Sequence, residues 1–408
     1  MSRTRMLALC FVLGSATTAT ADVITDWNEK AVAFVTPRMT PPAAQRAVAI
    51  VHVAMFDAVN AIEPRYRPYL VQLPVPSTAS KEAAAAAAAG AALQRLVPQA
   101  EKEIGAAVAA YLAAIQDGDA KQVGVKLGTA VAERFLEARR DDGANAADSY
   151  RPKTKPGVYV PTPITVGAAW PNLKPFAMTS PAQFRPQPPI ALASAQWAAD
   201  YNEIKDLGAR TSTSRSARQT EDARFWLIVG PQSTDPIARQ LVAAHKMSVV
   251  DSARFMALSA VALADAYVAV LEAKYHYDFW RPITAIRNGD NDDNPATERD
   301  AAWQPIDNTP MHPEYPCAHC IGSATLAAVV EAVLGSPNVP EIAMTSATAP
   351  GVTHRWTNMQ VYAAEVSNAR IWAGFHYRFS TVVGTDMGRK LGEYVARTVM
   401  QPAVMATR

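Results

Sequence analysis

The stretch Pro316–Gly335 reads PCAHCIGSATLAAVVEAVLG and predicts a helix with an anion site at its start. Its apolar part, residues 321–334, is long enough for a helix and is followed by Gly335, a residue type that often ends helices. The segment Pro316 to His319 then lies at the helix N-terminus, where free backbone N–H groups and the positive dipole end favour anions. His319 would point toward the same anion and can give or take a proton.

A basic pair lies earlier in the chain, in the segment KYHYDFWRP at residues 274–282. Lys274 and Arg281 are seven residues apart, which on a continuous helix is two turns and places them on one face, about 10 Å apart. The residues between them are largely aromatic, so a functional pair is favoured over a solvated basic face. Pro282 predicts that the helix ends near Arg281.

The third segment is Arg370–His376, which reads RIWAGFH. Gly374 is expected to end the helix that carries Arg370 and to turn His376 back toward it. A guanidinium group binds oxyanion oxygens through paired N–H donors, and an imidazole can attack phosphorus or coordinate a metal. Together the three segments predict one pocket for a tetrahedral oxyanion, with two imidazoles beside it.

The composition is that of a helical globular protein. The chain has 408 residues, of which 49% are hydrophobic and 19% charged, as in proteins with a sizeable core. Its net charge of +2 gives no global field that favours nucleic acid or a membrane surface. Alanine-rich runs such as residues 81–90 favour helix, and alternating β-branched stretches are scarce, so we predict an all-α fold. Helices are expected at residues 27–62 (two, the second at 41–62), 81–98, 101–139, 194–206, 216–228, 234–249, 252–280, 320–334, 358–373 and 381–398.

Two segments are expected to be irregular. Residues 151–190 contain ten prolines and cannot form a regular helix. Aromatic residues are interleaved with these prolines, so we expect a packed, extended wrap over the helices that forms one wall of a pocket. Residues 288–300 are acidic but lack the glycine placement of a calcium loop, and we expect a solvated loop there.

Residues 1–21 have the pattern of a secretory signal peptide. Arg3 and Arg5 precede the apolar run MLALCFVLG at residues 6–14, and Ala19–Ala21 fits a small-x-small cleavage site. The apolar run is too short for a stable membrane anchor. We therefore expect an exported protein, periplasmic or secreted, without a stable membrane anchor.

Export would leave Cys317 and Cys320 as the cysteines of the mature chain, because Cys10 lies in the signal segment. In an oxidising compartment a C-x-x-C pair is expected to close as a disulfide. The pair also resembles the redox motif of periplasmic thiol oxidoreductases, but the flanking helices lack the strand–helix alternation of that fold. A structural disulfide is favoured, with two quiet thiols as the alternative.

In identity, order and spacing, the three segments resemble the pocket shared by the vanadium-dependent haloperoxidases, the type 2 phosphatidic acid phosphatases and the bacterial acid phosphatases. The family pattern is Lys-x6-Arg-Pro, then Pro-Ser-Gly-His, then Ser-Arg-x5-His. The flanking sequences FWRPITAIR, HPEYP and ARIWAGFHYRF also look like this family, and VHVAMFDAVNAIEPRYRPY looks like its soluble bacterial members. The resemblance implies two packed helical bundles, with an N-terminal region at 22–190 that includes the wrap and a C-terminal bundle at 191–408 that holds the site. The matching residues are Lys274, Arg281, Pro282, Pro316, His319, Arg370 and His376.

The resemblance implies a cofactor-binding role for Lys274, Arg281, Arg370 and the backbone of Cys317 and Ala318, which would hold the oxyanion. Three positions depart from the family pattern, because Cys317 and Ala318 replace Ser and Gly, and alanine replaces the Ser before Arg370. Cys317 replaces a good hydroxyl donor with a poor one, and the methyl group of Ala318 crowds the anion.

The histidines would carry the chemistry. The resemblance implies that His319 is the acid/base, and that His376 is the vanadium ligand of a peroxidase or the phosphoryl-accepting nucleophile of a phosphatase. His312 lies seven residues before His319, where bromoperoxidase-like members carry a histidine. A loop histidine without a role is the alternative for His312.

Three functions are compatible with this sequence. The first choice is a vanadate-dependent haloperoxidase that oxidises a halide with hydrogen peroxide. The second is an acid phosphatase that cleaves phosphate monoesters through a phosphohistidine at His376, since the same pocket suits phosphoryl transfer. The third is an exported oxyanion-binding protein without turnover. In each case the partners are small molecules, and nucleic acid is not expected to bind.

Overall fold

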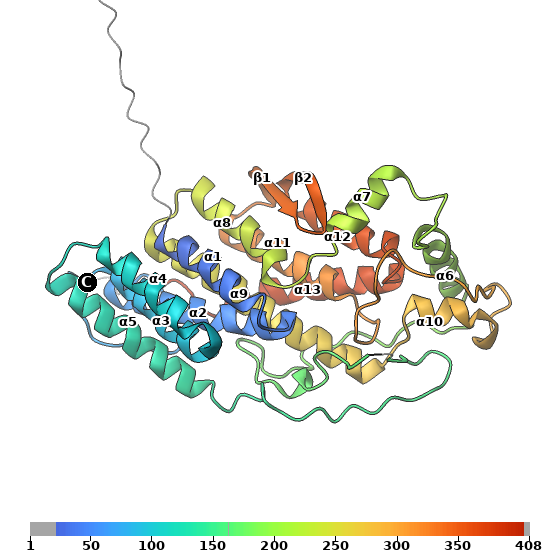
Figure 1. Cartoon of the computed structure of the whole chain (residues 1–408), viewed down its shortest axis with the longest axis horizontal. Helices are drawn as coiled ribbons and strands as arrows, with labels where there is room; N and C mark the ends of the chain where they lie inside the picture. The colour runs from blue at the N-terminus through green and yellow to red at the C-terminus, as the bar shows by residue number, and fades with distance from the viewer. Residues whose placement is uncertain (1–21, 162, 404–408) are drawn as a thin grey trace, which may run out of the picture.

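The computed structural model describes residues 22–161 and 163–403, and the expected signal segment at residues 1–21 lies outside them. Within these residues nearly all of the regular secondary structure is helical, which confirms the all-α prediction (Figure 1). The helices α1 to α5 gather at one end of the molecule, and α6, α7 and α10 lie toward the other (Figure 1). The α-helices are α1 (Val23–Val35), α2 (Pro41–Ile62), α3 (Lys81–Leu96), α4 (Glu101–Ala113), α5 (Asp119–Ala138), α6 (Ala195–Leu207), α7 (Ala217–Phe225), α8 (Asp235–Ala244), α9 (Val249–Tyr277), α10 (Pro282–Arg287), α11 (Ala318–Leu334), α12 (Met359–Trp372) and α13 (Arg378–Thr398).

Helix α9 is the central element. It begins at Ser248, whose side chain accepts a hydrogen bond from the backbone N–H of Asp251, a common way to satisfy the first helical turn. In length and composition α9 could cross a membrane, but nearly all of its apolar window is buried inside the protein, as expected for a core helix. It packs against α2 from the first half of the chain and against α11 and α13 from the second. One hydrophobic core therefore extends through both halves.

Lys274 and Arg281 do not share a helix, and this prediction was wrong. Helix α9 ends at Tyr277, and Asp278 turns the chain in the left-handed conformation with φ 51°. Arg281 is extended (φ −79°, ψ 154°) and precedes α10, which Pro282 begins. Proline is favoured in a first helical turn because its missing N–H is not needed there. Pro282 therefore starts a helix, whereas the sequence predicted that it would end one.

Close packing of α13 on α11 fixes the start of α11. Gly384, Gly388 and Gly392 recur at four-residue spacing and face the backbone of α11. A Cβ atom on Gly388 would lie 2.3 Å from the carbonyl oxygen of Ile321, so only glycine permits this approach. The backbone N–H of Cys317 also donates to the carbonyl oxygen of Ser380 in α13 (3.3 Å). These contacts hold the segment that carries His319.

The proline-rich segment forms the predicted irregular wrap. Its helical turn at Trp170–Asn172 is a short 3-10 helix. The carboxylate of Asp265, buried in α9, accepts hydrogen bonds from the backbone N–H groups of Phe176, Ala177 and Met178 at 2.6, 2.7 and 2.8 Å. The wrap is therefore anchored to the central helix.

A two-stranded hairpin is a second element, besides α10, that the sequence did not predict. Strands β1 (Asn338–Ser346) and β2 (Ala349–Asn358) pair antiparallel between α11 and α12. Ile342, Met344 and Ser346 alternate with more exposed neighbours and point inward, as in a half-buried strand. Since only one of these three residues is β-branched, a search for alternating β-branched residues misses the strand.

The acidic segment 288–300 is less solvated than expected. The side chain of Asp292 is buried and accepts hydrogen bonds from the indole N–H of Trp197 and the hydroxyl of Thr297, both at 2.7 Å. Asp290 and Asp293 are exposed. One carboxylate of this loop thus holds the loop against α6, while its neighbours face solvent.

Candidate functional site

The three segments meet at one open cavity of about 940 Å³. The proline-rich wrap contributes to the same cavity through Tyr159, Val160 and Pro163. Lys274 and Cys317 do not line it; both side chains are fully buried. The residues that the sequence predicted for the site and that line the cavity are Arg281, Ala318, His319, Arg370 and His376, together with His312.

Arg281 connects the loop before α11 with the turn after α12. Its guanidinium group donates to the carbonyl oxygens of His312 (2.9 Å) and Phe375 (3.0 Å). It also lies 3.2 Å from Nε2 of His376 and 3.0 Å from Nδ1 of His312. Arginine has only donors, so Nε2 of His376 must accept from it. One side chain thus orients two of the pocket's imidazoles.

Lys274 lies behind the residues that line the cavity and binds the loop before α11. Its Nζ donates to the carbonyl oxygens of Pro313 (2.9 Å) and Glu314 (2.6 Å). The side chain is 0% exposed. Lys274 and Arg281 therefore converge on the same loop although they lie on different elements.

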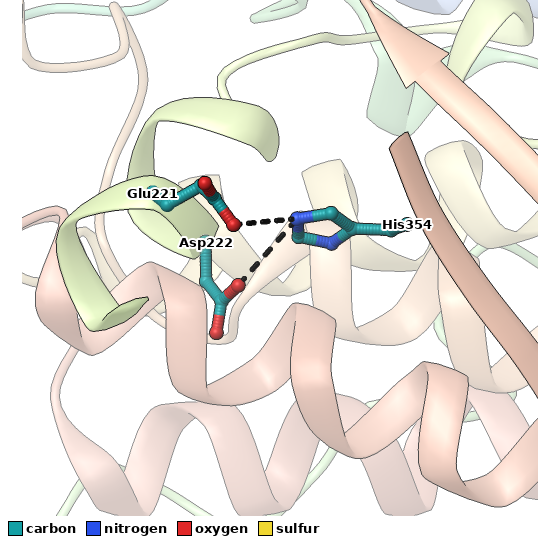
Figure 2. A group of neighbouring side chains, drawn as sticks. All are labelled: Glu221, Asp222 and His354. Atoms are coloured by element: carbon teal, nitrogen blue, oxygen red, sulfur yellow. Dashed lines mark ion pairs between the residues drawn. The ribbon is translucent and has the colours of Figure 1, made fainter. Parts of the chain in front are cut away.

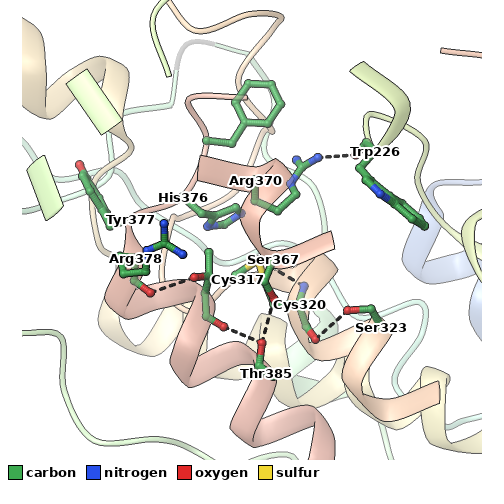
Figure 3. Close-up of a disulfide and its surroundings, with 12 residues drawn as sticks. Trp226, Cys317, Cys320, Ser323, Ser367, Arg370, His376, Tyr377, Arg378 and Thr385 are labelled. Carbon is green, nitrogen blue, oxygen red and sulfur yellow. Dashed lines mark hydrogen bonds between the residues drawn. A yellow bond between two sulfur atoms is a disulfide. The ribbon is translucent and has the colours of Figure 1, made fainter. Parts of the chain in front are cut away.

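Gly374 turns the chain so that Arg370 and His376 reach the same cavity. Helix α12 ends at Trp372, and Gly374 has φ +79°, a conformation that favours glycine. The backbone N–H of His376 then donates to the carbonyl oxygen of Arg370 (3.3 Å). Figure 3 shows both side chains beside the disulfide at the start of α11. Arg370 donates through one guanidinium nitrogen to the carbonyl oxygen of Trp226, while its Nε has no hydrogen-bond partner among the described residues.

The start of α11 carries a disulfide between Cys317 and Cys320, which is the closed form that the sequence favoured (Figure 3). Cys317 is the N-cap residue, and its Sγ accepts from the N–H of Cys320 (3.2 Å). The first intrahelical bond runs from Ile321 N–H to the carbonyl oxygen of Cys317. The N–H groups of Ala318 and His319 precede that bond and are placed for an anion.

The imidazole of His319 is fixed from the α7 side. Its Nε2 lies 3.0 Å from the carbonyl oxygen of Ile228. A carbonyl can only accept, so Nε2 carries the proton and Nδ1 is the basic nitrogen of the ring. His319 therefore enters the pocket as a neutral imidazole that can take up one proton.

Glu314 is the site residue that sequence reasoning missed. It is fully buried, and its Oε1 lies 2.8 Å from Nδ1 of His376 and 3.1 Å from the N–H of Tyr377. The carboxylate accepts a hydrogen bond from Nδ1–H, so Nε2 of His376 keeps its lone pair toward Arg281. A glutamate between prolines and aromatic residues, in HPEYP, was the available signal.

The pocket concentrates positive charge away from water. Burial lowers the pKa of Arg281 to about 10, and burial together with the charge of Arg281 lowers that of Arg370 to about 9. Burial and the same two arginines hold the pKa of Lys274 well below its usual value. Burial raises the pKa of Glu314 to about 7, although Lys274 and Arg281 act in the opposite direction. Three buried basic side chains thus share the site with one buried carboxyl group, and a bound anion would favour their charged forms.

The histidines of the pocket stay neutral. Burial, followed by the charges of Arg281 and Lys274, lowers the pKa of His376 well below 6.5. Burial and Arg370 have the same effect on His319. At neutral pH both rings therefore offer a lone pair, which is the form that can coordinate a metal or act as a base.

The sequence model of the VCPO second helical-bundle domain matches residues 254–404, which include all three segments. This part of the chain is therefore similar to that domain family. The superfamily resemblance drawn from the three segments is thereby confirmed. The match begins inside α9, so it does not test the predicted boundary at residues 190 and 191.

Comparison with whole proteins extends the similarity beyond residues 254–404 to most of the chain. The chain is 26% identical over 371 residues to the vanadium chloroperoxidase of Curvularia inaequalis, covering 69% of this chain and 59% of that protein. It therefore spans less than two thirds of that relative's length. Its fold is similar to a crystal structure described as the first bacterial vanadium-dependent iodoperoxidase, with TM-score 0.81 and 23% identity over 94% of this chain and 97% of that one. A holo-type bacterial vanadium-dependent chloroperoxidase matches with TM-score 0.73 and 18% identity over 90% and 94% of the two chains.

Proposed function

We propose that this protein is a vanadate-dependent haloperoxidase that oxidises a halide with hydrogen peroxide. The observation that carries the proposal is the set of three buried basic side chains, Lys274, Arg281 and Arg370, around the neutral imidazole of His376. Nε2 of this imidazole accepts a hydrogen bond from Arg281. The relatives described above are vanadium haloperoxidases by name, which supports the peroxidase over the phosphatase. Those relatives include both chloroperoxidases and an iodoperoxidase, so the proposal covers halide oxidation as a class.

The residues present fit a vanadate ion. The unpartnered Nε of Arg370 and the first-turn N–H groups of Ala318 and His319 are donors for its oxygens. Nε2 of His376 is a suitable metal ligand, because Glu314 holds the proton on Nδ1. Cys317 offers no hydroxyl and is tied into the disulfide, so the site has one side-chain donor fewer than the family pattern.

When bound, vanadate supplies a Lewis acid that activates hydrogen peroxide. Arg281 and Arg370 would orient the oxyanion through charge-assisted hydrogen bonds. Lys274 adds positive charge from behind the loop that it supports. Nδ1 of His319 would hold the proton that hydrogen peroxide releases in the pocket and return it as a general acid. These proposed roles are the ones that the family resemblance implies for the matching residues.

The cavity gives small molecules access to this pocket and has room for an organic substrate. Few large apolar side chains are exposed among the described residues. Three of them lie along the cavity, namely Val160, Val229 and Met311, with exposures of 38%, 39% and 41%. An apolar rim favours an organic acceptor of the oxidised halogen over a purely aqueous product. We propose halide, hydrogen peroxide and such an acceptor as the partners.

Halide oxidation by the purified mature chain tests the proposal. We expect oxidation of iodide or bromide by hydrogen peroxide only after addition of vanadate, and inhibition by excess phosphate, which competes for the pocket. Hydrolysis of a phosphate monoester without vanadate-dependent halide oxidation would instead select the phosphatase. Tight oxyanion binding with neither activity would select the binding protein.

Glu314→Gln is expected to weaken vanadate binding about 10- to 100-fold at pH 8, the usual effect of losing a group that orients a metal ligand. The amide NH2 can donate to Nδ1, which moves the ring proton to Nε2 and removes the lone pair. Equilibrium binding of vanadate to both proteins measures this effect. Glu203→Gln, which removes a carboxylate paired with Arg378 outside the pocket, is the matched control. Equal affinities in wild type and Glu314→Gln would show that Glu314 does not set the tautomer.

The substitution Glu314→Gln is expected to strengthen sulfate binding, whereas it is expected to weaken vanadate binding. Sulfate does not titrate near neutrality, so its affinity reports the charge of the pocket. The pKa of Glu314 is raised to about 7, so its carboxylate loses its charge as the pH falls through 7 and sulfate affinity rises, by up to about tenfold per pH unit. Glu314→Gln should bind sulfate more tightly than wild type at pH 8 and show no rise near pH 7. A rise centred at 6.5 or lower in both proteins would assign it to histidine instead.

We also propose that the mature protein is exported. The pattern of residues 1–21 supports export, and a disulfide next to the active site suits an oxidising compartment. The N-terminal sequence of the protein recovered from the cell envelope or medium should begin at residue 22. Recovery of the full-length chain from the cytoplasm would contradict export.

A further inference from the structure

A second cluster of chemically active side chains lies between α7 and β2, outside the oxyanion pocket. Glu221 and Asp222 of α7 direct their carboxylates toward the ring of His354 in β2 (Figure 2). Oxygens of Glu221 and Asp222 lie 3.7 and 3.6 Å from the same nitrogen, Nε2. His354 and Asp222 are buried, with exposures of 2% and 5%, and Glu221 reaches the surface.

The hydrogen bonds of His354 determine which nitrogen carries the proton. Nδ1 lies 2.6 Å from the carboxylate of Glu365. Glu365 also accepts the indole N–H groups of Trp226 and Trp356, both at 3.0 Å, so it is held as an acceptor. In the neutral ring the proton therefore sits on Nδ1, and Nε2 presents a lone pair to two carboxylates. Nε2 has no hydrogen-bond partner among the described residues.

The ring has little freedom to turn away from this arrangement. It stacks on Phe225 with the ring centroids 3.9 Å apart and the planes 3° from parallel. A lone pair facing two anions is unfavourable unless a cation or an added proton lies between them. The geometry thus points to a positive occupant at Nε2.

Arg218 only partly supplies the missing positive charge. It lies 2.8 Å from Asp222 and 3.2 Å from Glu221, but its side chain is 60% exposed. Arg218 contacts the carboxylates and not Nε2. Its single positive charge is set against the three carboxylates of Glu221, Asp222 and Glu365. An exposed arginine can swing into solvent and leave both oxygens free for a cation.

We propose that Glu221, Asp222 and His354 bind a divalent transition-metal ion, for which Zn²⁺ is the appropriate probe. One imidazole nitrogen and two carboxylate oxygens form a donor set that Zn²⁺ accepts. Donors at about 2.1 Å from a tetrahedral ion lie roughly 3.4 Å from each other, close to the distances from Nε2 observed here. The two carboxylate oxygens are within 4.8 Å of one another, and the exposed Glu221 has freedom to close that gap.

Glu365 completes the arrangement, because a carboxylate on the far nitrogen of a ligating histidine fixes its tautomer. The ion would tie α7 to β2. The residues that follow α7 provide the carbonyl oxygens of Trp226 and Ile228, which bind Arg370 and His319 of the oxyanion pocket. The metal would therefore stabilise one wall of the pocket and take no part in the reaction.

Zinc titration of the chelator-treated mature chain, followed by calorimetry, tests this site. We expect one ion per chain. Glu221→Gln, a substitution at a partly exposed position, should weaken binding at least about tenfold, and His354→Gln should abolish it. Arg218→Gln should strengthen binding several-fold, because a competing cation is removed. The control His276→Gln removes an exposed histidine at the end of α9 and should bind as wild type does.

Absence of zinc binding in the folded wild-type chain would overturn the proposal. So would binding that is unchanged in both Glu221→Gln and His354→Gln, since the ion would then lie elsewhere, for example at the pocket histidines. If His354→Gln fails to fold, Glu221→Gln and Arg218→Gln still decide the outcome, because their effects are predicted in opposite directions.

Discussion

Replacing His376 with alanine is expected to abolish vanadate binding and to lower halide oxidation by on the order of 10⁴-fold or more, as when a group that acts as part of a catalytic unit is removed. Arg281 and Glu314 together hold this imidazole as a neutral lone-pair donor in one tautomer, with Nδ1 bound to the carboxylate and Nε2 toward the guanidinium. Vanadate binding and the halide assay, run on the same preparations, measure the loss.

The matched control for this substitution is His276→Ala, since His276 is exposed on α9. It should retain the affinity and activity of wild type. The melting temperature of His376→Ala should be recorded as well, because the loss of a buried histidine leaves Glu314 without one of its donors. A folded His376→Ala protein that still binds vanadate as tightly as wild type would refute the assigned ligand.

The His319→Ala substitution is expected to separate binding from turnover. Loss of a general acid/base costs about 10²- to 10⁴-fold in rate, whereas loss of one hydrogen bond to the anion costs about tenfold in affinity. Vanadate should therefore still bind to saturation while halide oxidation falls to a small residue. Rates measured at saturating vanadate, beside the binding constant, distinguish the two effects.

His312→Ala is the comparison for this experiment, because His312 lines the same cavity and also contacts Arg281. A proton-transfer role that belongs to His319 predicts a much smaller rate loss in His312→Ala. Equal losses in both proteins would mean that the two imidazoles share the role. A His319→Ala protein with full activity would remove His319 from the mechanism.

The helices were predictable from local signals. The range of α2 agreed with the predicted helix at residues 41–62, because its apolar spacing and its proline start lie in the local sequence. The end of α9 was not predictable in this way. Asp278 adopts a left-handed conformation that few non-glycine residues adopt, and nothing in KYHYDFWRP marks that position.

The residues of the site were predictable from the sequence, but the hydrogen bonds between them were not. Spacing brought together Lys274, Arg281 and His376 in sequence reasoning, yet their partners are mostly backbone carbonyl groups from other segments, such as those of Pro313 and Phe375. Carbonyl partners have no residue-type signature. Glu314 was visible as a letter in HPEYP, but its role depends on a turn at Gly374 that brings His376 beside it.

A crystal structure of the mature chain soaked in vanadate tests the central claim most directly. The account predicts density for a vanadium atom bonded to Nε2 of His376 at about 2.0–2.2 Å, the usual range for a metal–imidazole bond. The oxygens should contact Arg281, Arg370 and the N–H groups at the start of α11, while Glu314 remains on Nδ1. Vanadate bound elsewhere, or a pocket that stays without an anion at saturating vanadate, would contradict the account.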